Sequence, residues 1–339
     1  MVYPLARRLL FALPPEVAHR WTLGGLHAAL AVPGGGGFIR RMTDPTPRPV
    51  EVLGLSFRNP VGLAAGFDKD ARHVQAMAAL GFGFVEVGSV TARPSPGNAR
   101  PRLFRLPADG ALINRMGLNN EGAEATAARL AGLERRPVPI FVNVAKSHDK
   151  TLSGDAAVAD YVRSITAMAP LADVLVLNIS CPNSGDGRTF EDPELLGPLL
   201  DAVTAAIGAD GPPLLVKVSP DLDAERLEAV ARLSLDAGAA GFTATNTTVD
   251  RSGLSTAAAA LDAIGPGGLS GAPLHARAVE TVRRLRAFVG PEVTLVGVGG
   301  IRGPDEARAF IDAGADLIQL YTGFIYGGPG TVRRICAGI

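Results

Sequence analysis

The segment V-L-V-L-N-I-S-C-P-N (174–183) contains a pattern that recurs along the chain and predicts its fold. A short apolar run ends in Asn178 and further polar residues, as is typical of a buried strand at the point where it leaves a sheet. Seven more runs share this pattern: 61–65, 84–88, 140–145, 214–218, 241–245, 294–299 and 317–321. Helical spacing is found between them, at 72–80, 122–130, 193–207, 224–237, 274–288 and 304–313. Strands that alternate with helices form parallel sheets, so these eight units predict an α/β fold, the (β/α)8 TIM barrel.

Length and composition fit one such barrel with a small appendage. The chain has 339 residues, of which 47% are hydrophobic, and this is enough for a large core. Its 33 basic and 33 acidic residues balance, which argues against a general nucleic-acid binder. The two cysteines form neither a disulfide framework nor a zinc-binding spacing, so we expect a reducing cytoplasm and no metal site.

Residues 1–40 form a separate unit that we expect to be helical. The pattern predicts one helix over 4–13, a break at Pro14 and Pro15, and a second helix from Pro15 or Glu16 to Val32. Four glycines at 34–37 are predicted to end the unit, which leaves residues 41–339 for the barrel domain. The apolar stripe of the second helix could lie on a membrane surface or pack on the barrel, and its periodicity alone favours the barrel.

The last two units contain glycine-rich turns that suit a phosphate group. They read G-V-G-G-I (297–301) and Y-T-G-F (321–324). In many barrels the turns after strands seven and eight bind phosphate through backbone N–H groups at a helix N-terminus. The alternative is a pair of ordinary tight turns, but two such turns at these strands favour the phosphate site.

Two lysines at strand ends are candidates for binding anions. Lys217 lies in the apolar run L-L-V-K-V, and burial of a lysine is costly unless an anion is near. A reduced flavin would supply that charge, whereas the alternative is a lysine that faces the surface. Lys69 follows the first strand and could hold a substrate carboxylate, or it could form a surface salt bridge with Asp68 or Asp70.

Asparagines and one cysteine also gather at the predicted strand ends. The asparagines are Asn114, Asn119, Asn143, Asn178, Asn183 and Asn246. Each amide offers a donor and an acceptor, which suits a pyrimidinedione ring, although turn formation explains many single asparagines. Cys181 could act as a base, because a thiol with a pKa of about 8.5 ionises far more easily than a serine hydroxyl. It could instead be a small buried hydrophobe, as we expect for Cys336.

Eight long motifs containing these residues resemble those of the dihydroorotate dehydrogenase family. They are N-P-V-G-L-A-A-G-F-D-K-D (59–70), G-S-V-T-A-R-P-S-P-G-N (88–98), R-P-R-L-F-R-L (100–106), I-N-R-M-G-L-N-N (113–120), N-I-S-C-P-N (178–183), A-T-N-T-T-V-D-R (244–251), G-G-L-S-G-A-P-L (267–274) and G-V-G-G-I (297–301). The resemblance covers nearly the whole chain and implies an FMN-dependent enzyme that oxidises (S)-dihydroorotate to orotate in pyrimidine (UMP) biosynthesis.

The resemblance also implies roles for individual residues. Cys181 would remove the proton from C5 of the substrate while a hydride leaves C6 for the flavin. The implied FMN contacts are Ala65, Gly66, Phe67, Asp68, Lys69, Ser89, Asn143, Asn178, Lys217, Thr245, Gly271, Gly300, Tyr321 and Thr322. The implied substrate contacts are Lys69, Asn114, Arg115, Met116, Gly117, Leu118, Asn178, Asn183, Asn246 and Thr247.

The N-terminal motif Y-P-L-A-R-R-L-L-F-A-L-P-P-E-V-A-H (3–19) resembles the helical extension of the class 2 enzymes. It implies peripheral membrane contact through residues 1–40 on the cytoplasmic side of the bacterial inner membrane, a membrane quinone as acceptor, and no obligatory protein partner. Cys181 departs from this class, because class 2 enzymes typically have serine there and class 1 enzymes cysteine. The alternatives are therefore a class 1-like enzyme using fumarate or a partner subunit, and a barrel that binds phosphate ligands without catalysis.

Overall fold

The computed structural model describes residues 2–180 and 189–339, and its centre is a closed barrel of eight parallel strands. The strands are β3 (Val61–Leu63), β4 (Phe84–Val90), β7 (Ile140–Val144), β8 (Val174–Asn178), β9 (Leu214–Val218), β10 (Gly241–Ala244), β12 (Thr294–Val298) and β13 (Leu317–Leu320). Each strand pairs with the next of these in chain order, and β13 pairs with β3. The predicted (β/α)8 barrel is thus confirmed. Each predicted run coincides with one of its strands, and β4 extends two residues beyond the predicted run 84–88.

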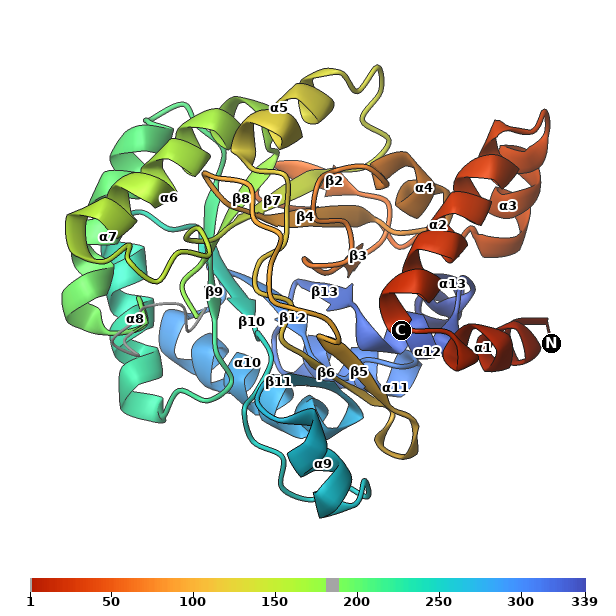
Figure 1. Cartoon of the computed structure of the whole chain (residues 1–339). Coiled ribbons are helices and arrows are strands. Elements are labelled where there is room, and N and C mark those ends of the chain that lie inside the picture. Colours follow the sequence, from red (N-terminus) through yellow and green to blue (C-terminus); the bar gives the residue numbers. More distant parts are fainter. Residues whose placement is uncertain (1, 181–188) are drawn as a thin grey trace.

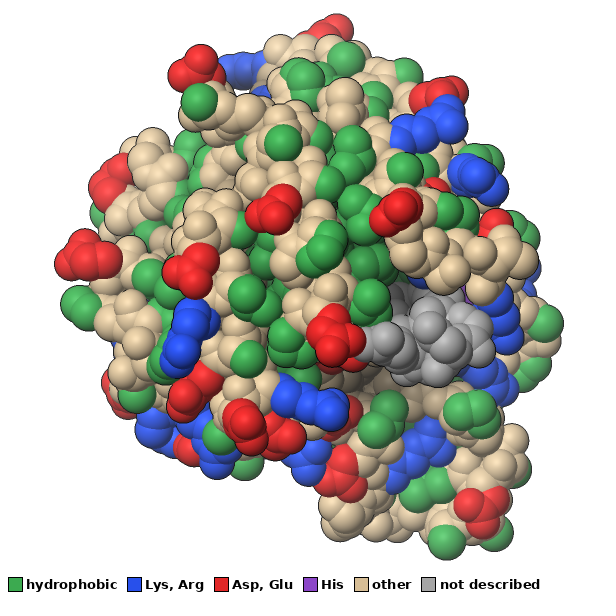
Figure 2. Space-filling view, turned by 90° about the vertical axis from the view of Figure 1, so that its left-hand side faces the viewer, with side chains coloured by type: hydrophobic (Ala, Val, Ile, Leu, Met, Phe, Trp, Pro, Cys, Tyr) green, Lys and Arg blue, Asp and Glu red, His purple; other side chains and the backbone are tan. Residues whose placement is uncertain are grey.

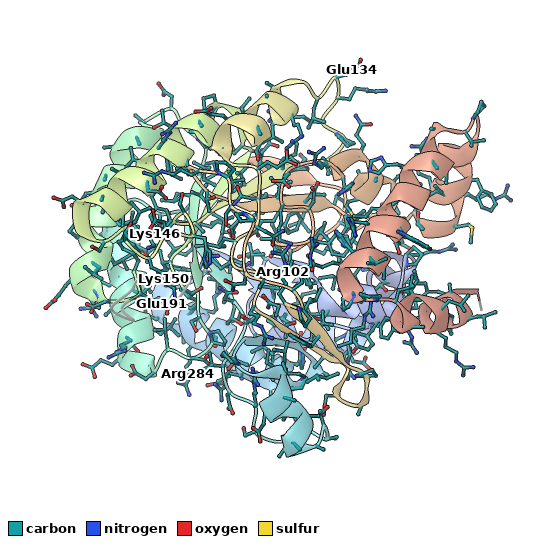
Figure 3. The ribbon with its side chains drawn as sticks, viewed as in Figure 1. Arg102, Glu134, Lys146, Lys150, Glu191 and Arg284 are labelled. Atoms are coloured by element: carbon teal, nitrogen blue, oxygen red, sulfur yellow. The ribbon has the colours of Figure 1, made fainter. Side chains whose placement is uncertain are left out.

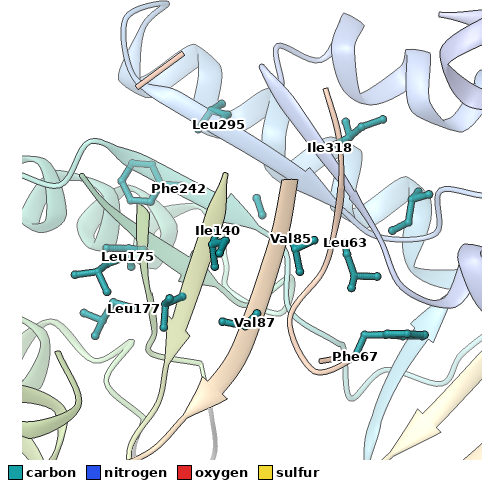
Figure 4. Packing of buried hydrophobic residues seen from close by; sticks show 14 of the residues in the cluster. Leu63, Phe67, Val85, Val87, Ile140, Leu175, Leu177, Phe242, Leu295 and Ile318 are labelled. Atoms are coloured by element: carbon teal, nitrogen blue, oxygen red, sulfur yellow. The ribbon is translucent and has the colours of Figure 1, made fainter. Parts of the chain in front are cut away.

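Helices surround the barrel and supply one side of its main core (Figure 1). They are α4 (Val74–Ala79), α5 (Ala123–Ala131), α6 (Gly154–Met168), α7 (Pro193–Ile207), α8 (Ala224–Asp236), α10 (His275–Val289), α11 (Pro304–Asp312), α12 (Thr322–Gly327) and α13 (Thr331–Gly338). Strand residues such as Leu63, Val85 and Ile140 are fully buried in this core (Figure 4). Each large side chain of this kind contributes about 1.5–3 kcal/mol of transfer free energy.

A second core fills the amino-terminal end of the barrel. The hairpin of β1 (Val50–Val52) and β2 (Leu55–Phe57) brings Phe57 against Phe84 and Phe141, which stand at the starts of their strands. Aromatic side chains therefore close this end, and only the carboxyl ends of the strands remain for a site.

A small antiparallel sheet, which the strand pattern did not reveal, lies outside the barrel. It consists of β5 (Leu103–Leu106), β6 (Ala111–Asn114) and β11 (Gly268–Gly271), with β6 in the centre. The helix α9 (Ala258–Ile264) precedes β11 and packs against this sheet through Leu261 and Ile264. The pairing of β6 with β11 places Asn114 opposite Gly268, although the two residues are far apart in the sequence.

The N-terminal unit has three helices, and the prediction that the glycines at 34–37 end it was wrong. After α1 (Val2–Ala12) and α2 (Pro15–Ala31), a third helix α3 (Gly35–Thr43) begins within these glycines. Gly34 takes the left-handed conformation, with φ of 79°, and turns the chain between the two helices. The predicted boundary at residue 40 thus falls inside α3.

The three N-terminal helices lie together at one side of the barrel, next to α12 and α13 (Figure 1). Tyr3 and Arg7 of α1 donate to the carbonyl oxygens of Ile325 and Tyr326, over 2.5 and 2.9 Å. Within 2–180 and 189–339, no helix is both long enough and apolar enough to cross a membrane. Acidic and basic side chains are both scattered over the face that includes α6, α7 and α8, so this face does not carry charge of a single sign (Figure 2).

Candidate active site

A cavity of about 690 Å³ opens at the carboxyl ends of the strands, and we call it the mouth cavity. Most of the residues predicted to bind cofactor or substrate line it: Ala65, Gly66, Lys69, Ser89, Asn114, Arg115, Met116, Gly117, Leu118, Asn178, Lys217, Thr245, Asn246, Thr247, Gly271, Gly300, Tyr321 and Thr322. Asn143 lies beneath Ser89 and is fully buried. Cys181 and Asn183 lie outside the described residues, so the role of Cys181 as the base stays a prediction.

The floor of the mouth cavity is built around Glu86 of β4, which is fully buried. Its carboxylate accepts hydrogen bonds from Asn143 Nδ2 at 2.8 Å and from Gln319 Nε2 at 2.5 Å. The ammonium group of Lys217 lies 3.5 Å from the same carboxylate. Lys217 is therefore buried rather than facing the surface, and its anionic partner within the described chain is Glu86.

The sequence interpretation missed Glu86 and Gln319. Each is a polar residue inside a short apolar run, F-V-E-V-G and L-I-Q-L. A polar residue inside an apolar run predicts a buried hydrogen-bonding group, because burial of such a group is costly unless it finds a partner. The partners, however, come from β7, β9 and β13, and only the closed barrel brings these strands to one place.

A row of hydrogen bonds leads from the floor to the wall of the cavity. Ser89 Oγ donates to Asn143 Oδ1 and accepts from Asn178 Nδ2 at 3.3 Å. Asn178 Oδ1 accepts from Ser180 Oγ at 3.1 Å, and Ser180 Oγ accepts from Asn246 Nδ2 at 2.6 Å. Three of the predicted asparagines thus belong to one network, which Ser180, a residue absent from the prediction, joins together.

The glycine-rich turns form a close-fitting cradle at the other end of the cavity. Gly271 and Gly300 have φ of 105° and 67°, which residues with side chains rarely adopt. A Cβ atom on Gly300 would lie 2.6 Å from Cβ of His275, and one on Gly271 would lie 2.4 Å from a carbonyl oxygen. Beside them, the hydroxyl groups of Ser270 and Thr322 are 2.8 Å apart. Bare backbone with hydroxyl groups suits a phosphate, so this donor set fits the phosphate of a nucleotide cofactor.

A second cavity of about 500 Å³ lies between the barrel and helices α1 and α2, and we call it the helix cavity. Its apolar lining includes Leu10, Phe11, Leu23, Leu26, Leu112 and Ile325. Phe67, Asp68 and Asn119, which were predicted near the mouth, line this cavity. Four residues line both cavities and form the partition between them: Gly66, Lys69, Met116 and Tyr321.

Lys69 is held in the partition by its own turn. Its ammonium group donates to the carbonyl oxygen of Gly66 at 2.5 Å, and burial lowers the pKa of Lys69 to about 8. Asp68 is occupied elsewhere, because its carboxylate accepts from the backbone N–H groups of Arg72 and His73 at 2.9 and 2.7 Å. These contacts leave Lys69 free to meet an anion at the edge of the mouth cavity.

The polar groups of the helix cavity are fixed by partners on α2. Arg102, which Figure 3 labels, is almost fully buried. Glu16 accepts from its Nε at 3.1 Å and from its Nη2 at 2.8 Å. Burial raises the pKa of Glu16, but hydrogen bonds and charge from Arg102 and Arg100 outweigh it and lower the pKa overall. Burial, with the charge of Lys69, lowers the pKa of His19 to about 4, so this imidazole is neutral at physiological pH.

Comparisons with known proteins cover both cavities and the N-terminal helices. A model of the dihydroorotate dehydrogenase family matches residues 49–339. The chain is 50% identical to dihydroorotate dehydrogenase (quinone) of Leifsonia xyli subsp. xyli, over 98% of each chain. It is 48% identical to the protein of that name from Mycobacterium tuberculosis strain H37Rv, over 100% of this chain and 93% of the relative. The crystal structure of DHODH in complex with ferulenol from Eimeria tenella superposes with a TM-score of 0.83 at 30% identity, covering 97% of this chain and 93% of that one.

Proposed function

The chain belongs to the dihydroorotate dehydrogenase family, and we propose that it oxidises dihydroorotate to orotate with FMN in the mouth cavity and a quinone in the helix cavity. The observation that carries this proposal is the thin partition between the cavities, formed by Gly66, Lys69, Met116 and Tyr321. A flavin against this partition could be reduced from one side and reoxidised from the other. Neither a phosphate-binding barrel without catalysis nor a class 1-like enzyme that uses fumarate or a partner subunit requires the second, apolar cavity.

Several residues of the mouth cavity would hold FMN. Ser89 and Asn178 offer hydrogen bonds to its ring, with Asn143 bonded directly beneath Ser89, and Lys217 offers a positive charge. The turn at Gly300, with Gly271, Tyr321 and Thr322, would receive the phosphate. Bound FMN supplies the capacity to accept a hydride from carbon and to deliver electrons to a second acceptor.

The substrate would lie at the open side of the same cavity. Its carboxylate would pair with Lys69, and its ring amide groups would meet the amides of Asn114, Asn178 and Asn246. Cys181 would take the proton from C5 as a hydride leaves C6. The substrate thus loses two electrons and two protons in all, and reduction of the quinone to the quinol consumes the same number.

The quinone would bind with its polar head toward the partition and its tail between α1 and α2. Arg102 is held by Glu16 and by the carbonyl oxygens of Pro96 and Asn98, and it has one guanidinium N–H left to donate. Neutral His19 offers a donor or an acceptor. Apolar side chains such as Leu23 and Leu26 would contact the ring and the tail.

The same helices would rest on the cytoplasmic surface of the bacterial inner membrane as a peripheral contact. Six of the eight large hydrophobic side chains that the described part exposes belong to residues 5–42: Leu5, Leu9, Trp21, Val32, Phe38 and Met42. Arg8 and Arg20, which are exposed on α1 and α2, would add attraction to anionic lipid head groups. A quinone could then pass from the membrane into the helix cavity.

The proposal is tested by measuring the two half-reactions separately in stopped flow. Dihydroorotate should bleach the flavin of the anaerobic protein, and a quinone should restore its colour faster than fumarate or NAD. Leu26→Trp fills the helix cavity and should slow the quinone step at least tenfold without changing flavin reduction. Leu9→Trp is the matched control, because Leu9 is 71% exposed on α1. A colourless protein, or fast reoxidation by fumarate with none by quinones, would contradict the proposal.

A further inference from the structure

The asparagines of the mouth cavity are joined in a row whose hydrogen bonds all run in one direction. The backbone N–H of Thr247 donates to Asn246 Oδ1 at 2.9 Å, and Asn246 Nδ2 donates to Ser180 Oγ. Ser180 donates in turn to Asn178 Oδ1. Each residue accepts on one side and donates on the other.

The second half of the row continues in the same direction to the floor. Asn178 Nδ2 donates to Ser89 Oγ, and Ser89 donates to Asn143 Oδ1. Asn143 Nδ2 then donates to the carboxylate of Glu86 at 2.8 Å. The row therefore runs from a backbone N–H group at the wall to a carboxylate at the floor.

Both ends of this row have a fixed hydrogen-bonding role. An asparagine amide or a serine hydroxyl can reverse, because each both donates and accepts. A backbone N–H can only donate and an ionised carboxylate can only accept. Thr247 and Glu86 impose the same direction, and reversal of any amide between them would place two donors or two acceptors face to face.

From this arrangement we infer that Glu86 is a positioning residue, whose carboxylate fixes the amide orientation of Asn143, Asn178 and Asn246 and balances the charge of Lys217. The inference rests on the proposed function for the identity of the ligands. One N–H of each amide is used within the row. At Asn178 and Asn246, which line the mouth cavity, the second N–H therefore stays available to a carbonyl oxygen. A flavin ring and orotate both carry such oxygens, so Glu86 would act on both ligands without touching either.

The first variant is Glu86→Gln, which has the same shape but no charge. Gln319 Oε1 is buried and has no hydrogen-bond partner in the described part of the chain, so it can accept from the new amide and preserve the fold. Lys217 then lacks its counter-charge, which favours the reduced, anionic flavin. We expect the reduction equilibrium of the bound flavin to shift about tenfold, or about 30 mV for two electrons.

The second variant is Ser180→Ala, which interrupts the row but leaves Glu86 and Lys217 in place. It should weaken orotate binding about tenfold in a titration of the flavin absorbance, while the flavin potential stays at the wild-type value. Asp160→Asn is the matched control for loss of a buried carboxylate. In the described part of the chain the Asp160 carboxylate accepts side-chain hydrogen bonds only from Ser147, and Asp160 lines neither cavity. Asp160→Asn should change neither the flavin potential nor the affinity for orotate.

The double variant with both substitutions decides whether the row acts as a unit. Glu86→Gln should itself weaken orotate binding, because an amide can present either a donor or an acceptor to Asn143 and no longer fixes the direction of the row. If Glu86 orients Asn246 through Ser180, the losses of orotate affinity in Glu86→Gln and in Ser180→Ala should not multiply. Losses that multiply, or a Glu86→Gln protein with unchanged potential and orotate affinity, would overturn the inference. Failure of the proposed function is distinct, because the wild-type protein itself would then hold no flavin or bind no orotate.

Discussion

Replacement of Lys217 by methionine should destabilise the protein mainly through the carboxylate that it leaves behind. Lys217 and Glu86 are 3.5 Å apart, and their side chains are 7% and 0% exposed. At an effective dielectric constant of about 20, charges at that distance attract by about 5 kcal/mol. Removal of one partner of a buried pair typically costs about 3–5 kcal/mol, because the other charge stays buried. The hydrogen bonds from Asn143 and Gln319 still stabilise the carboxylate, so we expect the free energy of unfolding to fall by about 3 kcal/mol, the lower end of this range.

The measurement is thermal unfolding of the flavin-free protein, which separates the charge pair from the loss of cofactor binding. The unfolding entropy is about 2.1 cal/mol/K per residue, or about 0.7 kcal/mol/K for this chain. A loss of about 3 kcal/mol should therefore lower the melting temperature by about 4 °C. Lys150→Met is the control, since Lys150 is exposed and the change should cost less than about 0.5 kcal/mol.

The refuting result comes from the double variant Lys217→Met with Glu86→Gln. Removal of both charges leaves no uncompensated ion, so most of the lost stability should return. If the double variant melts no higher than Lys217→Met alone, the isolated carboxylate is not the cause. The loss would then have to be assigned to the packing of the lysine side chain.

Four further outcomes are expected. Orotate affinity should fall as the pH rises through about 8, where Lys69 loses its proton, and Lys69→Arg should move this fall to a higher pH in the same titration. Gly300→Ala should reduce FMN retention at least tenfold, whereas Gly253→Ala, with a similar φ but open space, should only cost about 1–2 kcal/mol in a melting experiment. Cys181→Ala should keep its flavin but not reduce it with dihydroorotate, and Cys181→Ser should need a higher pH for reduction. Leu9→Glu should weaken sedimentation with anionic vesicles but leave activity with a soluble quinone intact.

The strand and helix pattern was readable because it is local. Each strand is short, apolar and followed by polar residues, and each of the predicted helices between them keeps its apolar spacing. The family prediction is confirmed by the comparisons, because long motifs such as 59–70 place many residues at once. The prediction that the glycines at 34–37 end the N-terminal unit failed because it also rested on local sequence alone. Glycine has a low helix propensity, but α3 packs against α2 and α4, and these tertiary contacts outweigh that propensity.

The network beneath the cavity could not be predicted, because its members lie far apart in the sequence. Ser180 was quoted only as part of a motif, and nothing local indicates that it bonds to Asn246, 66 positions away. The sheet of β5, β6 and β11 was missed for the same reason, since β11 follows β6 by more than 150 residues. Local pattern and the family motifs together thus predict most of the residues that face the cavity, but not how they bond to one another.

Lys217 illustrates what the structure adds to a correct prediction. The sequence indicates a buried lysine that needs an anion, and a flavin was the candidate. The structure supplies a carboxylate, Glu86, within the described chain, so the floor is nearly neutral before any cofactor binds. Lys217 therefore cannot act on the flavin as an unpaired charge. Its influence on the reduced flavin depends on how tightly Glu86 is held by Asn143 and Gln319, which is why we expect those neighbours to tune the potential.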